Sequence, residues 1–497
     1  MNLATIIEGH PADSPALVSR GKTTTYGELR DQVAHLRGRL AGLGVGPGDR
    51  VAIIAANNWY FVVAYLATLG LGAIGVPLNP QSPAPEIERE LAAVGARLAL
   101  VGPTARAAAS GLDTSGVDGF EGLHAIGDLV GPGPGGEAGD DDRPPPIADA
   151  GDDDPAVLLF TSGTAGAPRP AILTHGNLRA NLDQMMAGPA HPEGPDEVAL
   201  AVLPLFHVFG LNAVLDLALS IGASVVLVER FDPYTSLEEV ATHGVTLMSG
   251  VPTMWAAWAD LPTLSPGALA TVRLAASGAA PLDPEVRTRV RDRLGLDLAE
   301  GYGLTEASPV VTTGVGHDAP DGSIGVPLPG IELRLVDSDG EDALVGDPGE
   351  IWVRGPNVFP GYWNDPEATA AALTDDGWLR TGDVAVVDDD GFLALVDRAK
   401  DVIVVSGFNV FPAEVEEILE AHPGIDVAAV VGVPHPHSGE AVKAFVVPAP
   451  GAHLEEDAVI DHAGRYLARY KCPTTVAFVE EVPHGVTGKV IRRALRT

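Results

Sequence analysis

The chain contains little cysteine and little lysine, and its acidic side chains outnumber its basic ones. A single cysteine, Cys472, excludes an internal disulfide and is typical of a reducing compartment such as the cytoplasm. Only five lysines occur in 497 residues, and 31 basic against 67 acidic side chains give a formal net charge of −36. This charge argues against binding to nucleic acid or to an anionic membrane, because their phosphates would be repelled.

Charged residues are also absent from residues 51–85, a stretch long enough to cross a bilayer. Asn57 and Asn58 interrupt its apolar character early, and prolines that include Pro77, Pro80 and Pro83 break it late. We therefore predict a buried strand–helix–strand unit here and no integral membrane segment. The N-terminus has no basic region ahead of its short apolar stretch, so it does not resemble a signal peptide.

The length of the chain exceeds one ordinary core, so two or more domains are expected. Apolar runs of strand length alternate with helical patterns, which predicts an α/β fold with mostly parallel sheets and helices on their faces. Residues 131–154, rich in Gly, Pro and Asp, are expected to form an exposed loop. The last hundred residues predict a smaller α+β unit, with helices at 412–421 and 456–470 and strands at 427–433 and 442–447.

The first pattern that indicates chemistry is LLFTSGTAGAPRPAILTHGN, residues 158–177. Glycines let the backbone turn tightly and approach a ligand, and hydroxyls with free N–H groups can surround phosphate oxygens. By itself the stretch is equally typical of a Gly/Ser/Thr hairpin between two core strands. It is not a Walker A loop, because no Lys-Ser or Lys-Thr pair stands at the required offset from its glycines.

A more specific pattern is Glu-Gly-Tyr-Gly-Leu-Thr-Glu, residues 300–306. The Thr305 hydroxyl suits a phosphate, and the Glu306 carboxylate suits Mg²⁺, which prefers one or two carboxylates together with phosphate oxygens. Helix capping by these two residues would explain the pair but not the whole heptad. Other candidates, such as His207 between two apolar residues and Lys489 near the C-terminus, each have an ordinary structural explanation when taken alone.

Taken in order, these patterns resemble the motifs of AMP-forming acyl-CoA synthetases, the adenylating superfamily that also holds luciferases and peptide-synthetase adenylation domains. Residues 161–170 resemble its phosphate loop, and residues 300–306 match its next motif residue by residue. Residues 485–489 resemble its Asn-x-Thr-Gly-Lys pattern. The resemblance covers essentially the whole chain.

The resemblance implies a large N-terminal domain over residues 1–399 and a small mobile C-terminal domain over residues 400–497, with Lys400 as the hinge. It implies ATP, Mg²⁺ and CoA as cofactors. The implied catalytic residues are Lys489, Thr305, Glu306 and His207, of which Glu306 also holds the metal. The implied cofactor-binding residues are Thr161, Ser162, Gly163, Thr164, Ala165, Gly166, Arg169, Gly278, Ala279, Ala280, Glu300, Gly301, Tyr302, Thr305, Asp383, Arg398, Ser406 and Gly407. The implied acid-binding residues are Phe206, His207, Val208, Ala276, Gly301, Pro309 and Val310.

Three positions depart from the family pattern. Arg169 stands where the phosphate loop usually has lysine, and it keeps the cation while adding a fork suited to phosphate. Pro170 replaces a glycine, which fixes φ and removes an N–H, so we expect a stiffer loop. Gly485 takes the place of the usual asparagine. The first two departures leave open how the loop closes. They do not affect the resemblance.

The implied chemistry is attack of a carboxylate on the α-phosphate of ATP, with loss of pyrophosphate, followed by displacement of AMP by the CoA thiol. Both reactants of the first step are anionic, so cations and N–H groups around the phosphates lower the barrier. Lys489 would act between the carboxylate and the α-phosphate. The small domain would then rotate and present Ser406 and Gly407 to CoA.

The acid itself is less clearly indicated. Peptide-synthetase adenylation domains carry Asp at the position of His207, which speaks against an amino acid, and Ala276 lacks the polar group that some aryl-acid ligases have there. A fatty or other bulky apolar acid is therefore expected. Two alternatives remain open. One is an acyl-AMP ligase that loads an acyl-carrier protein, and the other is a nucleotide-binding protein without turnover.

Overall fold

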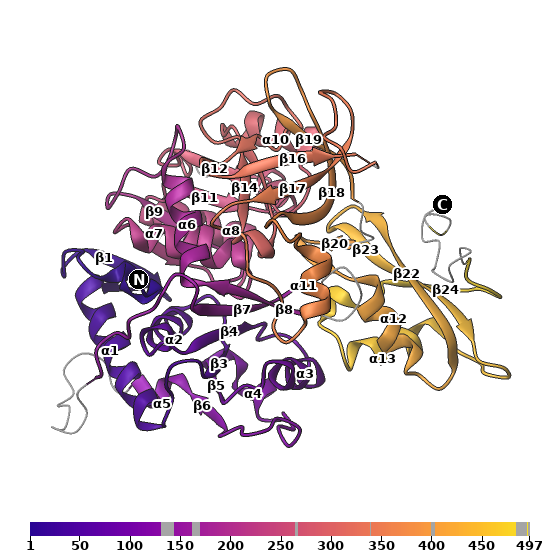
Figure 1. Ribbon diagram of the computed structural model, residues 1–497, viewed down its shortest axis with the longest axis horizontal. Coiled ribbons are helices and arrows are strands. Elements are labelled where there is room, and N and C mark those ends of the chain that lie inside the picture. The colour runs from indigo at the N-terminus through magenta and orange to yellow at the C-terminus, as the bar shows by residue number, and fades with distance from the viewer. Residues whose placement is uncertain are drawn as a thin grey trace.

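The structure is a computed structural model that describes residues 1–130, 144–161, 169–263, 267–337, 339–398, 403–483 and 495 (Figure 1). Within these residues the strands form four sheets, three in a large N-terminal domain and one in a smaller C-terminal domain. The mixed α/β architecture with mostly parallel sheets is therefore confirmed. The predicted hinge, Lys400, lies outside the described residues.

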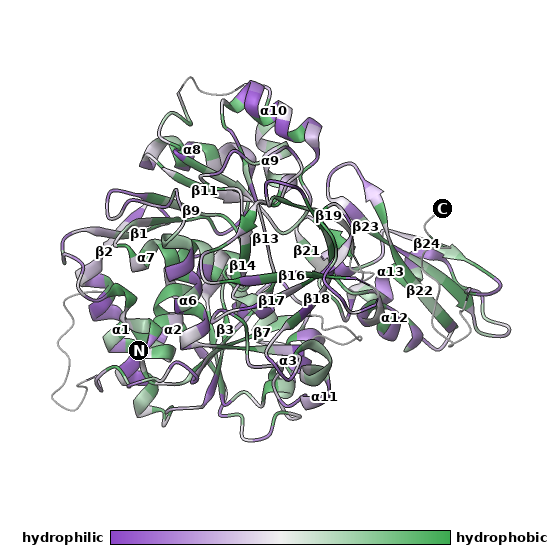
Figure 2. Cartoon of the chain, turned by 45° about the horizontal axis from the view of Figure 1, so that its top comes forward, coloured by the Kyte–Doolittle hydropathy of each residue, from purple (hydrophilic) through white to green (hydrophobic). Residues whose placement is uncertain are grey.

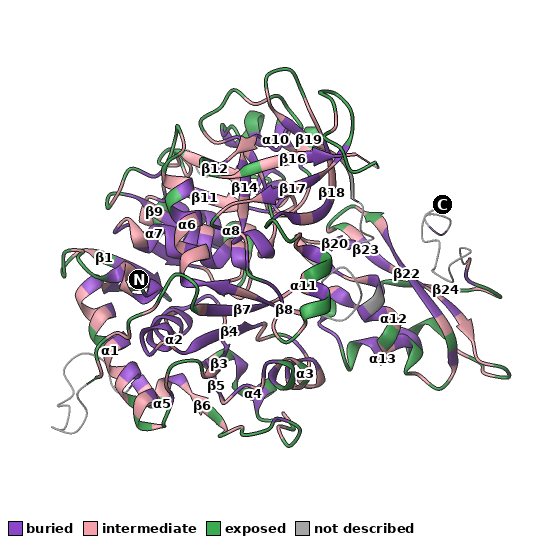
Figure 3. Cartoon of the chain, viewed as in Figure 1, coloured by how far each residue is buried: buried purple, intermediate pink, exposed green. Residues whose placement is uncertain are grey.

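The first sheet has the strand order β6-β5-β3-β4-β7-β8 and is parallel except for β8. Its strands are β3 (Arg50–Ile54), β4 (Ile74–Leu78), β5 (Leu98–Val101), β6 (Leu123–Ala125), β7 (Pro155–Thr161) and β8 (Arg169–Thr174). Helix α2 (Trp59–Gly70) joins β3 to parallel β4, so the strand–helix–strand unit predicted for the uncharged stretch is confirmed. The helix is buried from Phe61 to Gly70, as Figure 3 shows, because it is apolar on all sides.

The second sheet has the order β15-β14-β13-β12-β11-β9-β10-β1-β2, with β13 through β1 parallel. Its strands are β1 (Pro15–Ser19), β2 (Lys22–Thr25), β9 (Val198–Ala201), β10 (Ser224–Leu227), β11 (Leu247–Gly250), β12 (Leu274–Ser277), β13 (Ala299–Gly303), β14 (Val310–Thr313) and β15 (Val326–Pro327). Helix α2 contacts β3 and β4 of the first sheet and β1 of the second, so it lies between the two sheets.

Helices α3 (Ala84–Val94) and α4 (Arg106–Ala109) cover the outer face of the first sheet, and α8 (Pro233–His243), α9 (Pro252–Ala259) and α10 (Pro284–Leu294) cover that of the second. Helices α1 (Tyr26–Gly42), α5 (Ile126–Val130), α6 (His175–Met186) and α7 (Leu217–Ser220) pack with α2 in the core between the two sheets. Helix α11 (Pro366–Ala372) contacts β18. In α10 the buried residues Arg287, Val290 and Leu294 share one face, and the hydrophilic residues of the helix are visible in Figure 2. No helix of the described residues is long and apolar enough to span a membrane.

A four-stranded antiparallel sheet leads to the small domain. It is formed by β16 (Glu332–Val336), β17 (Gly349–Arg354), β18 (Leu379–Val387) and β19 (Leu393–Arg398). The small domain contains β20 (Ile403–Val405), β21 (Phe408–Val410), β22 (Ile425–His435), β23 (Gly439–Pro448), β24 (Thr475–Phe478), α12 (Pro412–Glu420) and α13 (Glu456–Gly464). Its own core forms between α12, α13 and the sheet.

One expectation of the sequence needs correction. The helix predicted over 456–470 ends at Gly464, because glycine is a poor helix residue and the following segment instead contacts the large domain. Residues 144–154 have no helix or strand and are exposed or half-buried, as expected of a loop, and two hydrogen bonds tie them to the rest of the large domain. Arg37 Nε donates to the Pro145 carbonyl, and the Ala148 N–H donates to the Gly70 carbonyl.

Candidate functional site

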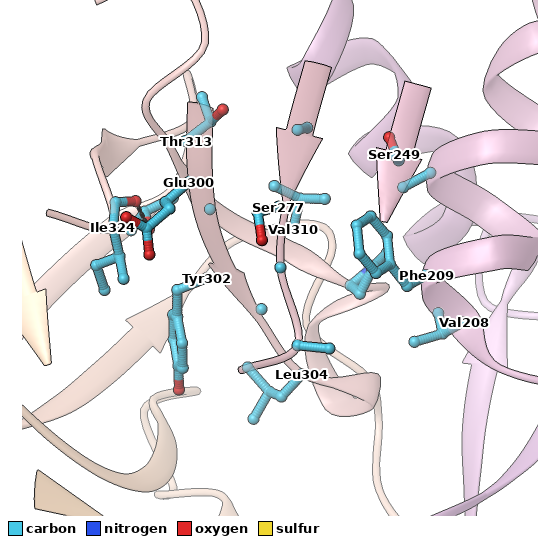
Figure 4. Close-up of a pocket in the computed structure, with 18 of the residues that line it drawn as sticks. Val208, Phe209, Ser249, Ser277, Glu300, Tyr302, Leu304, Val310, Thr313 and Ile324 are labelled. Carbon is cyan, nitrogen blue, oxygen red and sulfur yellow. Dashed lines mark hydrogen bonds between the residues drawn. The ribbon is translucent and has the colours of Figure 1, made fainter. Parts of the chain in front are cut away.

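A cavity of about 350 Å³ lies along the parallel strands β11, β12 and β13 and reaches beyond their carboxyl ends (Figure 4). Open parallel sheets bind their ligands at this end, because the strands stop there and the loops that follow diverge. The cavity has a polar end, near Glu306 and Asp383, and an apolar end that follows the strands back toward Leu247 and Leu274.

Alternate residues of the three strands form the floor of the apolar end, because successive side chains of a strand point to opposite faces. The floor consists of Leu247, Ser249, Leu274, Ala276, Ala299 and Gly301. The residues between them, such as Met248 and Ala275, are buried in the core on the other face of the sheet. Ser249 is half-buried, and its hydroxyl has no hydrogen-bond partner among the described residues.

The facing wall comes from η3 (Phe209–Asp216), a π-helix that follows His207 and Val208. Gly210 allows this turn to form, because a Cβ there would lie 2.4 Å from the Pro204 carbonyl oxygen. His207 Nδ1 accepts a hydrogen bond from the Phe209 N–H at 3.3 Å. Desolvation lowers the pKa of His207 to about 4, so the imidazole is neutral at pH 7 and suits a pocket for an uncharged acyl group.

Glu306 is the carboxylate at the polar end of the cavity, and it is 8% exposed. Its Oε1 accepts hydrogen bonds from the Tyr362 hydroxyl at 2.8 Å and from the Thr161 hydroxyl at 3.2 Å. The Thr161 contact joins the end of β7, where the glycine-rich loop begins, to the motif that follows β13. A carboxylate held in this way, with its other oxygen free of described donors, fits a magnesium ion that takes most of its ligands from phosphates and water.

Asp383 is the second carboxylate at this end. Its Oδ2 accepts a hydrogen bond from the Tyr302 hydroxyl at 2.8 Å, and burial, together with the Asp383 charge, raises the pKa of Tyr302 well above its usual value. Asp383 is half-buried and keeps capacity to accept from the paired hydroxyls of a sugar. Across the β18–β19 ladder its register partner is Arg398.

The structure gathers most of the sequence-predicted residues that it describes around this cavity. On the lining are Thr161, His207, Val208, Ala276, Gly278, Ala279, Ala280, Glu300, Gly301, Tyr302, Thr305, Glu306, Pro309, Val310, Asp383 and Gly407. Ser162, Gly163, Thr164, Ala165, Gly166 and Lys489 lie outside the described residues.

Of the predicted residues whose side chains the structure describes, Arg169, Phe206 and Ser406 are not on the lining, and the Arg398 side chain is not described. Arg169 forms an ion pair with Asp365, Nε to Oδ2 at 2.6 Å, and its Nη1 is buried without a partner among the described residues. Phe206 does not line the cavity. Its ring stacks on Phe408 of the small domain, with 6.3 Å between ring centroids.

The loop after β20 brings the small domain to the edge of the cavity, where Gly407 and Phe411 belong to the lining. Gly407 has φ of +85°, and a Cβ there would lie 2.5 Å from Val251 Cγ1 of the large domain, so only glycine fits. The Ser406 N–H donates to the Ser438 carbonyl at 2.8 Å, which ties the loop to its own domain.

Sequence reasoning did not single out several lining residues. Ser277 is 2% exposed, and its hydroxyl has no partner among the described residues. Other lining residues with polar groups that were not singled out are Ser249, Thr312, Thr313, Tyr362, Arg380 and Thr381. Alternation along a short buried strand could have indicated Ser249. The contact of Tyr362 with Glu306 joins residues that are 56 apart in the sequence, and no local pattern indicates it.

The arrangement places hydroxyls and carboxylates beside an apolar pocket, which suits transfer between two bound molecules. Comparison with known proteins agrees. Residues 3–363 match the AMP-binding enzyme family, and residues 414–489 match the AMP-binding enzyme C-terminal domain.

Curated relatives and solved structures are similar over nearly the whole chain. A feruloyl-CoA synthase of Amycolatopsis sp is 40% identical, over 96% of this chain and 94% of its own. A long-chain-fatty-acid–CoA ligase of Yersinia pestis is 37% identical, over 98% and 92%. The structure of an amide bond synthetase from Marinactinospora thermotolerans superposes with a TM-score of 0.88 at 31% identity, over 100% of this chain and 99% of that one. The chain therefore belongs to the AMP-binding enzymes, as an AMP-forming acid–thiol ligase that uses ATP, Mg²⁺ and CoA.

Proposed function

We propose that the acid activated by this enzyme is a fatty acid or another acid with a bulky apolar body. The observation that carries the proposal is the strand-built floor of the cavity, where five of the six side chains facing the acid are apolar or absent. The neutral imidazole of His207 on the facing wall supports it, because a charged group there would disfavour an apolar acyl group.

The length of the apolar end bears on the size of the acid. The apolar end runs alongside β11, which spans three residue steps from Leu247 to Gly250, or about 10 Å at the usual rise of a strand. A phenylpropenoic acid or a medium-length fatty acid suits this depth. The relatives named for feruloyl-CoA and for long-chain fatty acids support testing these two classes side by side.

Within this proposal, different residues of the polar end bind different parts of the nucleotide. The hydroxyl of Thr305 and the loop over 162–166 bind phosphates, and Asp383 accepts hydrogen bonds from the ribose. Glu306 holds Mg²⁺, which when bound neutralises phosphate charge. Lys489 binds at the junction of the acid and the α-phosphate, and residue 400 is the hinge that lets the small domain bring it there and withdraw it.

Release of pyrophosphate tests the proposal directly. We would measure it with MgATP and a panel of fatty, phenylpropenoic, short-chain and dicarboxylic acids, with and without CoA, in the wild type and in Lys489→Ala. We expect turnover with apolar acids only, complete dependence on acid, and a large loss in the variant. Preferred turnover of short or dicarboxylic acids would overturn the proposed acid class. Full activity of Lys489→Ala would overturn the role of the lysine.

A further inference from the structure

A buried ionic cluster joins the two domains at a distance from the cavity. Lys471 of the small domain places its Nζ 2.5 Å from Glu86 Oε1 of α3, in the large domain, and 2.8 Å from Glu414 Oε1 of α12. The three side chains are 4–8% exposed. The other carboxylate oxygen of Glu86 accepts the Ala468 N–H at 2.7 Å. Glu86 therefore binds two groups of the small domain at once.

The pairing of Glu86 depends on the orientation of the two domains, whereas Lys471 also has Glu414 as a partner within its own domain. Glu90, also on α3, faces the same cluster, and burial together with the charge of Glu86 raises its pKa to about 8, which keeps it protonated at neutral pH. Burial likewise raises the pKa of Glu414. Removing carboxylates and an ammonium from water is costly and is offset only by close partners. If the small domain rotated away, Glu86 would lose its cation and would have to regain water.

The cluster is connected to the edge of the cavity through a short chain of contacts. Tyr470, next to Lys471, stacks on Phe408 with 4.5 Å between centroids, and Phe408 in turn stacks on Phe206 of the large domain. Glu414 lies in the first turn of α12, which begins directly after Phe411 on the cavity lining. The orientation that pairs Lys471 with Glu86 is thus the one that seats the loop over 406–411 at the cavity.

We propose that Glu86 and Lys471 are positioning residues that hold the small domain in the orientation for thioester formation. In that step the thiol sulfur of CoA forms a bond to the acyl carbon while the bond from that carbon to the AMP oxygen breaks. The thiol proton leaves to solvent. In this orientation the small domain brings Gly407 and Phe411 of the loop over 406–411 to the cavity lining, whereas Thr305, Glu306 and Asp383 of the nucleotide end belong to the large domain. The pair therefore acts on the second half-reaction.

Two variants that each remove one carboxylate from Lys471 make a matched test. Glu86→Gln weakens a bond between domains, and Glu414→Gln weakens a bond within the small domain. With any acid that the wild type turns over, exchange of pyrophosphate into ATP without CoA measures the first half-reaction. Single-turnover transfer from acyl-AMP to CoA measures the second.

We expect Glu86→Gln to slow transfer to CoA at least about tenfold and to leave pyrophosphate exchange within about twofold, because it weakens the buried pair between the domains. Glu414→Gln should affect transfer much less. Equal losses in both half-reactions, an unchanged transfer rate in Glu86→Gln, or the same selective loss in Glu414→Gln would each overturn the proposal.

Hydrogen exchange in the free enzyme gives a second measurement that needs no acid. In Glu86→Gln we expect faster exchange in peptides over 466–471, which include the Ala468 amide, and in the loop over 406–411. Glu414→Gln should leave the Ala468 amide protected. Protection that is unchanged in Glu86→Gln would contradict the proposal even if transfer to CoA were slower.

Discussion

The cavity and the interdomain cluster both bury titratable side chains. The buried group of the cavity is neutral, whereas the buried groups of the cluster form ion pairs. At the apolar end of the cavity the titratable group is uncharged, because desolvation lowers the pKa of His207 to about 4. In the cluster, the ammonium of Lys471 is paired with the carboxylates of Glu86 and Glu414. The floor and facing wall of the cavity belong to the large domain, whereas the cluster pairs groups of both domains.

This difference separates the part of the site that one domain builds from the part that depends on contacts between two domains. The floor and facing wall of the cavity come from the large domain alone, and their shape is fixed by β-sheet packing. The small domain reaches the cavity through a loop whose place depends on contacts between the domains. Changes in the large-domain site should therefore damage the first half-reaction and everything after it, while changes in the cluster should damage only the second.

The strongest test of this comparison is Glu306→Gln. We expect acid-dependent pyrophosphate exchange to fall by about 10²–10³-fold, because the metal ligand and its charge are lost at the phosphates. Tyr362→Phe is the matched control. It removes one hydrogen bond to Glu306 but keeps the carboxylate, so its loss should be far smaller. Exchange that survives in Glu306→Gln would show that the metal is held elsewhere.

A change in the shape of the floor should affect choice of acid rather than chemistry. We expect Ala276→Leu to lower kcat/KM for a bulky acid by about 10–100-fold, because the added carbons fill the space of the acyl group. Activity with a short acid should change little, and Ala276→Gly should shift preference toward larger acids. The panel of acids used for the wild type provides the measurement. A uniform loss across the panel would place Ala276 outside the acid pocket.

The ribose end should show a smaller effect, confined to nucleotide binding. We expect Asp383→Asn to raise KM for ATP about tenfold with little change in kcat, because one charge-assisted hydrogen bond is weakened. Tyr302→Phe removes the hydroxyl that donates to Asp383 at 2.8 Å and should have a weaker effect. A kcat defect with unchanged KM in Asp383→Asn would argue against a binding role.

The smallest effect concerns stability in the large-domain core. Asp216 accepts the Tyr65 hydroxyl at 2.9 Å, and burial raises the pKa of Asp216 to about 8. Between the unfolded pKa, about 4, and about pH 8, the folded state holds a proton that the unfolded state has released, so stability falls as pH rises.

Asp216→Asn should remove this slope and raise the melting temperature at pH 8 by a few degrees, with little change at pH 5. Thermal melts of the wild type, Asp216→Asn and the exposed control Asp31→Asn would measure it. Equal slopes in all three proteins would mean that Asp216 does not remain protonated in the folded state.

Local patterns in the sequence predicted much of this molecule. Helices and strands whose formation depends on neighbouring residues can be predicted from apolar runs and helical periodicity. The strand–helix–strand unit around α2 and the parallel strands are examples. The motif over 300–306 also carried the positions of Tyr302 and Glu306, because a strand followed by a sharp turn places its last side chains at the sheet's carboxyl edge.

The sequence could not indicate partners that are distant in the chain. Glu86 occupies a helix whose charged residues are typical of a solvated face, and Lys471 is 385 residues away. Phe206 belongs to an aromatic motif typical of a pocket, yet its ring stacks on Phe408 of the other domain. The helix predicted to Tyr470 ends at Gly464 for the same reason, since the segment after it is held by the large domain.

By itself, then, the sequence indicated the chemistry of this enzyme, because the residues proposed to contact the nucleotide and metal stand in short segments whose spacing is set by local backbone geometry. The tertiary structure alone decided which carboxylates are buried away from water and which cation pairs with them. Burial and pairing depend on elements that meet only when the domains pack, and the free energy of a charge depends on those surroundings far more than on its neighbours in sequence.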